Sequence, residues 1–179
     1  GPQRRLETVS DDYGPLFHAR HNAFGHRIAR QSLRHAGHSL GSELSLSTVH
    51  FLYLENRLVA EARSGGPGEP VRITRRYLHA GWVPVGMIDY PEHGPPQLFA
   101  VHADLSGTPR LLTDQRGTVR WLARYSPTGR AIRMAGEIAF PLRFPGQYED
   151  SATGWHDNLL RTYVPDDGHY LEPDPMGPT

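Results

Sequence analysis

Short apolar runs separated by turn residues are the feature that most limits how this chain can fold. From residue 49 onward, branched and aromatic residues alternate with Gly, Pro, Asn and Asp, and the chain holds 19 glycines and 16 prolines among 179 residues. Runs bounded in this way are typical of strands joined by tight turns. The sequence therefore predicts a mainly β fold of antiparallel hairpins with little helix. The only helix candidate is residues 28–38, where Gly37 limits the length.

Two stretches have the spacing of β-hairpins. Residues 49–54 and 57–62 flank the dipeptide Glu55-Asn56, a linker of hairpin length. Residues 71–88 supply a second set of branched and aromatic side chains, from Val71 through Trp82, interrupted once by an Ala-Gly dipeptide. We expect one hairpin in each stretch.

Three further strands are expected at residues 98–102, 109–113 and 118–125. In the last of them, one set of alternate residues is apolar (Val119, Trp121, Ala123, Tyr125) and the other is largely basic (Arg120, Leu122, Arg124). A period of two predicts a strand with one dry face and one wet face.

A weak repeat marks the corners between strands. A turn residue, then Gly or Asn, then a polar residue and a strand start recur in FGHRIA (24–29), ENRLVA (55–60), TGRAIR (128–133) and DGHYLE (167–172). The separations are uneven, so a regular propeller or solenoid is not indicated. We expect these positions to be hairpin corners.

Composition excludes several functional classes. Lys plus Arg and Asp plus Glu both total 19, so the formal net charge is zero and nothing favours nucleic acid or an acidic membrane surface. The absence of cysteine excludes disulfides, thiolate metal sites and a cysteine nucleophile. No apolar run is long enough for a membrane span, and the start GPQRRLETVS lacks the apolar region of a signal peptide.

Three candidate chemistries have simpler explanations. The basic residues of the strand region could form a stripe for phosphate, with Trp121 or Tyr125 stacking on bases, but a solvated or cross-strand-paired face, helped by Asp104, Asp114 and Glu137, is favoured. Ser106 lies in a turn outside any nucleophile elbow. Five crowded histidines lack a carboxylate in a metal-ligand pattern, so surface or turn positions are expected for them: His18, His21, His26, His35 and His38. No pattern points to a cofactor or a metal.

Acidic residues cluster over the last thirty positions, around Arg161. They are Asp150, Asp157, Asp166, Asp167, Glu172 and Asp174. Two carboxylates that share a site are pushed to different pKa values and can divide acid and base roles. Turn chemistry alone also explains the Asp-Asp-Gly at 166–168, and Pro173 and Pro175 fix an extended path around Asp174.

Residues 102–131, HADLSGTPRLLTDQRGTVRWLARYSPTGRA, and 142–177, LRFPGQYEDSATGWHDNLLRTYVPDDGHYLEPDPMG, resemble the Rhs repeat-associated core domain. This domain is the C-terminal part of the Rhs/YD-repeat toxin shell and is related to the C subunits of Tc toxin complexes. Upstream, HNAFGHRIARQ and HFLYLENRLVAEA resemble the hairpin units that precede it. The resemblance covers most of the chain from about residue 11.

The resemblance implies a hollow β-hairpin shell around a C-terminal toxin, closed at one end by the core domain and followed by an aspartic self-cleavage site. It assigns catalytic roles to Arg161 in RTYVP and Asp174 in DPMG, with Pro173, Pro175 and Gly177 supporting the motif. A second Asp in another Asp-Pro-x-Gly motif completes the family's site. The printed sequence stops at Thr179, so we expect this isolated chain not to be a working protease.

The same resemblance predicts three regions: a flank, or residues left by tag removal, at 1–10, hairpin shell at 11–140 and the C-terminal core region at 141–179. It implies a secreted bacterial effector used against competitors through type VI secretion. The implied partners are the rest of the shell, the enclosed toxin, a secretion spike protein and a chaperone, and unpaired edge strands predict self-association of the fragment. Two alternatives are a residual aspartic hydrolase that pairs Asp174 with Asp150 or Asp157, and a β-rich module binding carbohydrate or protein through exposed aromatic side chains.

Overall fold

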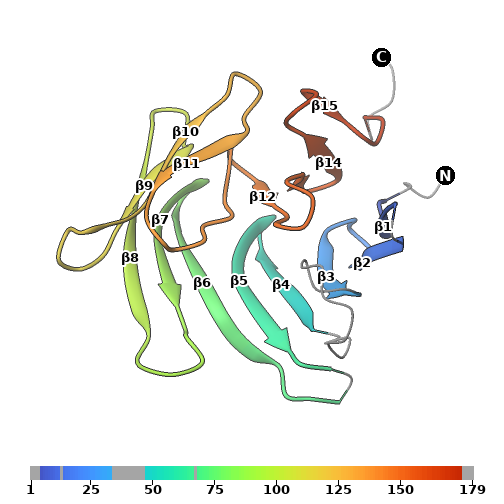
Figure 1. Ribbon diagram of the computed structural model, residues 1–179, viewed down its shortest axis with the longest axis horizontal. Coiled ribbons are helices and arrows are strands. Elements are labelled where there is room, and N and C mark those ends of the chain that lie inside the picture. The colour runs from blue at the N-terminus through green and yellow to red at the C-terminus, as the bar shows by residue number, and fades with distance from the viewer. Residues whose placement is uncertain (1–4, 13, 34–46, 67, 175–179) are drawn as a thin grey trace.

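The computed structural model describes residues 5–12, 14–33, 47–66 and 68–174, and all of its regular elements are strands (Figure 1). Their bounds are β1 Thr8–Asp11, β2 Gly14–His21, β3 Arg27–Ser32, β4 Thr48–Leu54, β5 Arg57–Ser64, β6 Arg72–Ala80, β7 Val83–Asp89, β8 Gln97–Ala103, β9 Pro109–Thr113, β10 Val119–Tyr125, β11 Ala131–Ala135, β12 Gln147–Glu149, β13 His156–Asn158, β14 Arg161–Val164 and β15 His169–Tyr170.

The strands form two sheets in chain order. β1 to β11 make an antiparallel sheet of 11 strands, the large sheet, and β12 to β15 make a second antiparallel sheet of 4 strands, the C-terminal sheet. Within each sheet, every strand pairs with its sequence neighbours, as short connections between consecutive strands favour. The predicted mainly β class built of antiparallel hairpins is confirmed.

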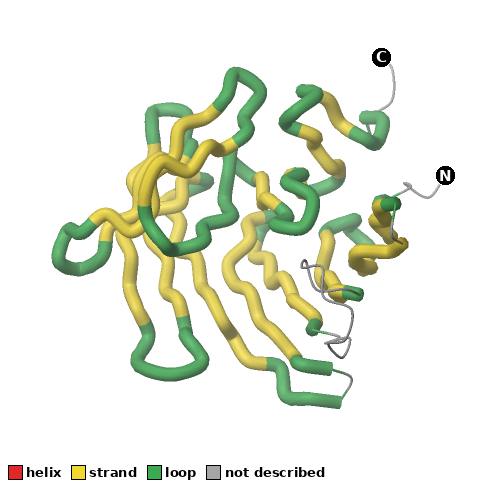
Figure 2. The backbone as a smooth tube through the Cα atoms, in the orientation of Figure 1, coloured by secondary structure: helices red, strands yellow, loops and turns green. Residues whose placement is uncertain are grey.

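The predicted helix at 28–38 is wrong in the part that the structure describes. Residues 27–32 form β3, which pairs with both β2 and β4. Arg27 and Ala29 are buried there, and pairing with neighbouring strands on both sides outweighs a modest helix propensity. Residues 34–38 lie outside the described residues. Figure 2 shows strands and loops only, and among the described residues no helix is long and apolar enough to cross a membrane.

The predicted hairpins are confirmed with two corrections. The strands at 49–54, 57–62, 98–102 and 109–113 match β4, β5, β8 and β9 within a few residues. Trp82 lies in the turn between β6 and β7 and not in a strand, because Ala80 pairs with Val83 directly. On β10, Trp121 and Ala123 are buried as expected, but Val119 is 43% exposed, since the register with β9 shifts between Val119 and Trp121.

The four repeated corners are all strand-to-strand turns. Each contains a residue with positive φ: Gly25 at 83°, Asn56 at 64°, Gly129 at 90° and Gly168 at 69°. Glu55 is also at positive φ, 48°, so the two-residue corner Glu55-Asn56 has the backbone that a hairpin loop of this length prefers. The recurring sequence pattern therefore records local turn geometry.

The core forms where the chain crosses back over the large sheet after β11. Phe140 packs on Trp121 with ring centroids 5.3 Å apart, and Tyr148 packs edge-on against Phe51 at 5.0 Å. Further along, Trp155 packs beside the small buried cluster that contains Phe17. The segment that follows β11 thus passes over β10, then β4 and then β2, and it covers one face of the large sheet.

Gly136 begins this crossing. Its φ is +91°, and a Cβ at this position would lie 2.1 Å from the carbonyl oxygen of Arg120. Ile138 then donates its backbone N–H to the same carbonyl at 3.2 Å. Only glycine allows the chain to leave β11 so close to β10.

Several arginines on the strands are paired with nearby carboxylates, as the paired-face interpretation predicts. Guanidinium-to-carboxylate distances are 2.9 Å for Arg75–Asp89, 2.7 Å for Arg110–Asp104 and 2.6 Å for Arg120–Glu137. The charges of these three arginines are therefore neutralised locally.

Candidate functional site

The hairpin of β14 and β15 brings Arg161 and Asp174 together. β14 begins at Arg161, the chain turns at 165–168, and β15 returns alongside it, with Tyr163 opposite Tyr170. Beyond β15 the backbone pairing continues, because Leu171 N–H donates to the carbonyl of Thr162 at 2.9 Å. Arg161 Nη1 and Asp174 Oδ2 are 3.3 Å apart, although the residues are separated by thirteen positions in the chain.

Tyr170 holds the guanidinium of Arg161. The Arg161 Cζ atom lies 3.8 Å from the centre of the Tyr170 ring. The Tyr170 hydroxyl accepts a hydrogen bond from Asn158 Nδ2 at 2.7 Å, and Asn158 is the strand partner of Arg161. The stacked ring and the carboxylate together orient a guanidinium whose side chain is 27% exposed.

Glu172 fixes the path of the segment that carries Asp174. Its carboxylate accepts from Thr162 N–H at 2.6 Å and from Thr162 Oγ1 at 3.1 Å. Pro173 follows and is exposed. The segment just before Asp174 is therefore bonded to β14, and the side chain of Asp174 is 52% exposed.

Several of these positions were not singled out from the sequence. Glu172 belongs to the acidic cluster, but nothing in the spacing indicated its bond to Thr162, and Tyr170 and Asn158 had no assigned role. The only available signal was the corner DGHYLE, which places Tyr170 and Glu172 on the strand returning beside Arg161. Of the residues expected to support the motif, Pro175 and Gly177 lie outside the described residues.

Asp150 and Asp157 are held by a different set of arginines. Asp150 Oδ2 lies 3.1 Å from Arg27 Nη1 and 3.0 Å from Arg30 Nε. Asp157 contacts Arg5 Nη2 at 3.2 Å and Arg27 Nε at 3.9 Å. Both carboxylates are buried, so their side chains join the C-terminal sheet to β3 and to the N-terminal segment, seen in Figure 1 as red strands beside blue ones.

Burial controls the electrostatics of this buried cluster. Loss of water raises the pKa of Asp157, and the nearby guanidiniums of Arg27 and Arg5 oppose that rise. Burial lowers the pKa of Arg27, but Asp157 and Asp150 more than compensate and hold it above its ordinary value. Burial, with Arg5 and Arg27 adding to it, also lowers the pKa of His21 to about 4, so His21 is neutral near pH 7.

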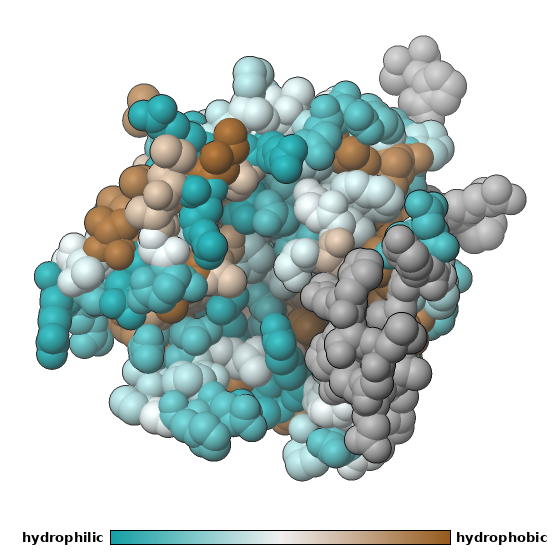
Figure 3. Space-filling model, viewed as in Figure 1, coloured by the Kyte–Doolittle hydropathy of each residue, from teal (hydrophilic) through white to brown (hydrophobic). Residues whose placement is uncertain are grey.

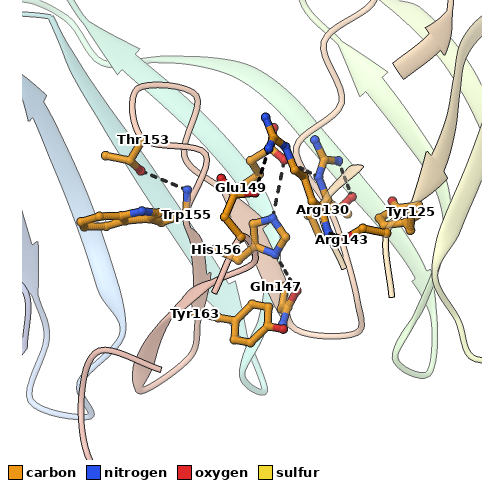
Figure 4. A network of polar contacts seen from close by, with 12 residues as sticks. Tyr125, Arg130, Arg143, Gln147, Glu149, Thr153, Trp155, His156 and Tyr163 are labelled. Atoms are coloured by element: carbon orange, nitrogen blue, oxygen red, sulfur yellow. Dashed lines mark hydrogen bonds and ion pairs between the residues drawn. The ribbon is translucent and has the colours of Figure 1, made fainter. Parts of the chain in front are cut away.

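A second buried network supports β12 and β13 (Figure 4). Arg143 Nε donates to Glu149 Oε2 at 2.8 Å, and Arg143 Nη1 donates to the carbonyls of Phe140 and Leu142. His156 is fully buried, with Nδ1 2.8 Å from Gln147 Oε1 and Nε2 3.6 Å from Glu149. Burial alone would raise the pKa of Glu149, but the nearby imidazole of His156 and the hydrogen-bonded guanidinium of Arg143 hold it at about 2.

The crowded histidines do not converge. His18 contacts the Thr8 hydroxyl at 2.8 Å, and His26 lies in the turn between β2 and β3, where it is buried with its ring stacked on Tyr53 at 5.0 Å. His35 and His38 lie outside the described residues. Within the described part of the chain, no group of three or more His, Asp or Glu side chains could hold a metal ion.

Several known proteins are similar in sequence to this chain, two of the three described here over nearly its whole length. The double-stranded DNA deaminase toxin A of Burkholderia cenocepacia is 32% identical over 192 residues, which cover 98% of this chain and 13% of that toxin. The toxin protein Tse5 of Pseudomonas aeruginosa is 39% identical over 90 residues, covering 49% of this chain and 7% of Tse5. The probable deoxyribonuclease RhsA of Dickeya dadantii is 27% identical over 98% of this chain and 12% of its own length. The chain thus spans about an eighth or less of these relatives.

Solved structures share the fold. A crystal structure of TcdB2-TccC3-Cdc42 superposes with a TM-score of 0.68 at 20% identity, over 95% of this chain and 9% of that one. The Photorhabdus luminescens Tc holotoxin pore, with a TccC3 variant, gives a TM-score of 0.65 at 19% identity, over 94% and 8%.

The fold defines a class: a meander of antiparallel β-hairpins, consistent with a β-rich Rhs shell, with its C-terminal segment folded back across one face. The family model described as RHS protein matches residues 101–134. The chain belongs to the Rhs family and is an Rhs-associated core domain.

Proposed function

We propose that this chain is the closing region of a hollow Rhs shell that encloses a C-terminal toxin, and that Arg161 and Asp174 act in the aspartic self-cleavage that severs the toxin. The observation that carries the proposal is the 3.3 Å contact between Arg161 and Asp174. The family resemblance also implies a thirteen-residue spacing between these two residues of the self-cleavage motif. In this assignment residues 1–10 are a flank, 11–140 belong to the shell wall and 141–179 to the closing region, although β1 already begins at Thr8.

The chemistry requires two carboxylates and a cation. One carboxylate activates the attacking water and the other protonates the amide that leaves, while a guanidinium holds one of them ionised. Arg161 supplies the cation and Asp174 one acid. The resemblance assigns the second acid to a further Asp-Pro-x-Gly motif of the longer protein, and the half-exposed side chain of Asp174 leaves room for that segment to approach.

The two alternatives have less support. A hydrolase that pairs Asp174 with Asp150 or Asp157 would have to recruit carboxylates that are buried against Arg5, Arg27 and Arg30. A carbohydrate-binding face would need exposed aromatic rings gathered on one face, but Trp121 is buried, and the exposed rings of Phe24 and Trp82 lie in different turns, between β2 and β3 and between β6 and β7.

The proposal extends to the longer protein. Relatives named as toxins support a C-terminal toxin domain as the enclosed partner, with the rest of the shell as the contact on the N-terminal side. Delivery as a secreted effector through type VI secretion, with a spike protein and a chaperone as partners, is part of the same proposal.

The test uses the longer natural protein with its shell and toxin regions, expressed and separated on a denaturing gel. We expect two fragments from the parent, and one intact band from Asp174→Asn and from Arg161→Ala. Asp167→Asn is the matched control, because Asp167 is an exposed acid in the turn of the same hairpin, and it should cleave like the parent. Cleavage that persists in Asp174→Asn would contradict the assignment.

A further inference from the structure

Arg5 reaches from the N-terminal segment to the turn that precedes Arg161. Its Nη2 donates to Asp157 Oδ1 at 3.2 Å and to the carbonyl of Leu159 at 3.0 Å. The side chains of Arg5 and Asp157 are only 6% and 5% exposed. One buried guanidinium group therefore binds both the strand β13 and the turn after it, across more than 150 positions of sequence.

The turn held by Arg5 is strained. Leu159 has a φ of 54°, the left-handed region that side-chain-bearing residues rarely adopt. It lies between Asn158 and Arg161, which pair with each other across the turn. The conformation of Leu159 thus determines where β14 begins and from which point the Arg161 side chain projects.

Arg27 holds the same carboxylate from a second element. It contacts Asp157 at 3.9 Å and Asp150 at 3.1 Å, and its guanidinium lies 5.0 Å from the centre of the Phe51 ring. Asp157 in turn is the strand partner of Thr162, the residue that anchors Glu172. An unbroken series of contacts therefore runs from the N-terminal strands through Asp157 to the segment that carries Asp174.

We propose that Arg5 is a positioning residue that makes self-cleavage depend on docking of the N-terminal strands against the C-terminal sheet. Arg5, bound to Asp157 and to the Leu159 carbonyl, fixes the strained turn, and the fixed turn sets Arg161 against Asp174. The inference rests on the proposed function of that pair. Cleavage would then follow closure of this part of the shell, so that the toxin is severed only after it has been enclosed.

The first experiment measures the rate of self-cleavage in the longer protein with Arg5→Met and Arg5→Lys. Loss of the contacts that Arg5 makes with Asp157 and Leu159 should slow self-cleavage about 10- to 100-fold, since small misplacements of catalytic groups have effects of that size. Arg5→Lys keeps a donor and a charge and should restore part of the rate. The control is Arg130→Met, which removes an exposed pair with Asp166 in the β14–β15 turn and should change the rate by about twofold or less.

The second experiment does not depend on cleavage. Amide hydrogen exchange is followed in an Asp174→Asn background at Thr162 and Leu171, whose N–H groups are bonded within this hairpin. Arg5→Met should accelerate exchange there and leave β6 to β8 unchanged, whereas Arg130→Met should leave both regions unchanged.

The outcomes separate the two proposals. Cleavage of Arg5→Met at the parent rate, or unchanged exchange at Thr162 and Leu171, would overturn the role of Arg5. Faster exchange throughout β6 to β8 would show that Arg5 stabilises the fold in general. That result would also overturn its role as a positioning residue. If Asp174→Asn still cleaves, the catalytic assignment fails on its own, while the exchange measurement still decides whether Arg5 controls the hairpin.

Discussion

Glu149 shows how a single side chain can make the fold sensitive to acid. It is bound by Arg143 and lies near the buried His156, and these contacts hold its pKa at about 2 against an ordinary value of 4.5. A carboxyl whose pKa is lower in the folded state stabilises the fold above its unfolded pKa, and this stabilisation is lost as the pH falls through the folded pKa. The contribution should be complete above about pH 4.5 and disappear toward about pH 2.

We expect Glu149→Gln to flatten this pH dependence. The ionised carboxylate should contribute on the order of 2 kcal/mol after allowance for the solvent that reaches it. The free energy of unfolding, measured with urea at about pH 5 and about pH 3, should differ less in the variant than in the parent. Glu137→Gln, which removes a carboxylate that is 62% exposed, should retain the parent's decline, and an equal decline in Glu149→Gln would disprove the role of the network.

At the scale of elements, β3 links the two sheets. β3 carries Arg27 and Arg30, and both guanidinium groups contact Asp150, which directly follows β12 of the C-terminal sheet. Read without its neighbours, this segment resembled a helix with basic residues. It is a strand because it pairs with β2 on one side and with β4 on the other. Its buried Arg27 is neutralised by an acid more than 120 residues away.

Arg27→Met tests this connection. Its removal leaves Asp150 and Asp157 buried with fewer cationic partners, which should cost about 3 kcal/mol in the free energy of unfolding. Arg130→Met, at a pair that is 62% exposed on both sides, should cost less than about 1 kcal/mol. The free energy of unfolding is measured with urea. Equal losses in the two variants would mean that burial does not make the ion pairs of Arg27 more important than that of Arg130.

The hairpin elements were predictable and their assembly was not. The corner at Glu55-Asn56, the strand at 109–113 and the buried positions of β10 follow from turn chemistry and a period of two. The pairing of Arg161 with Asp174 was expected from the family resemblance, whereas the stacking of Tyr170 on Arg161 and the bond between Glu172 and Thr162 depend on the return of β15 beside β14.

At the scale of the whole molecule, the large sheet is open at both ends. Within the described residues, β1 and β11 each pair on one side only, and β11 exposes Ile132 and Met134 by about half. Figure 3 shows hydrophobic surface on the side of the molecule where β8 to β11 lie. Unpaired backbone beside exposed apolar side chains favours association through the edge.

We expect the isolated chain to associate with itself in sizing chromatography at increasing concentration. Met134→Lys places a charge on the edge strand and should shift the equilibrium toward the monomer. Leu105→Lys is the control, because Leu105 is fully exposed in the turn between β8 and β9 and not on an edge strand. A parent chain that elutes as a monomer at every concentration would contradict the expectation.

The sequence by itself determined the local structure of this Rhs core domain: the positive-φ corners, the alternating strands and the motif that carries Arg161 and Asp174. These depend on interactions between residues that are close in the chain, so the residue types are sufficient to predict them. The tertiary structure decided which arginine meets which carboxylate, and it separated Asp150 and Asp157 from Asp174. Those contacts join residues up to 152 positions apart, and they exist only because the chain crosses back over its own sheet and buries the charges together.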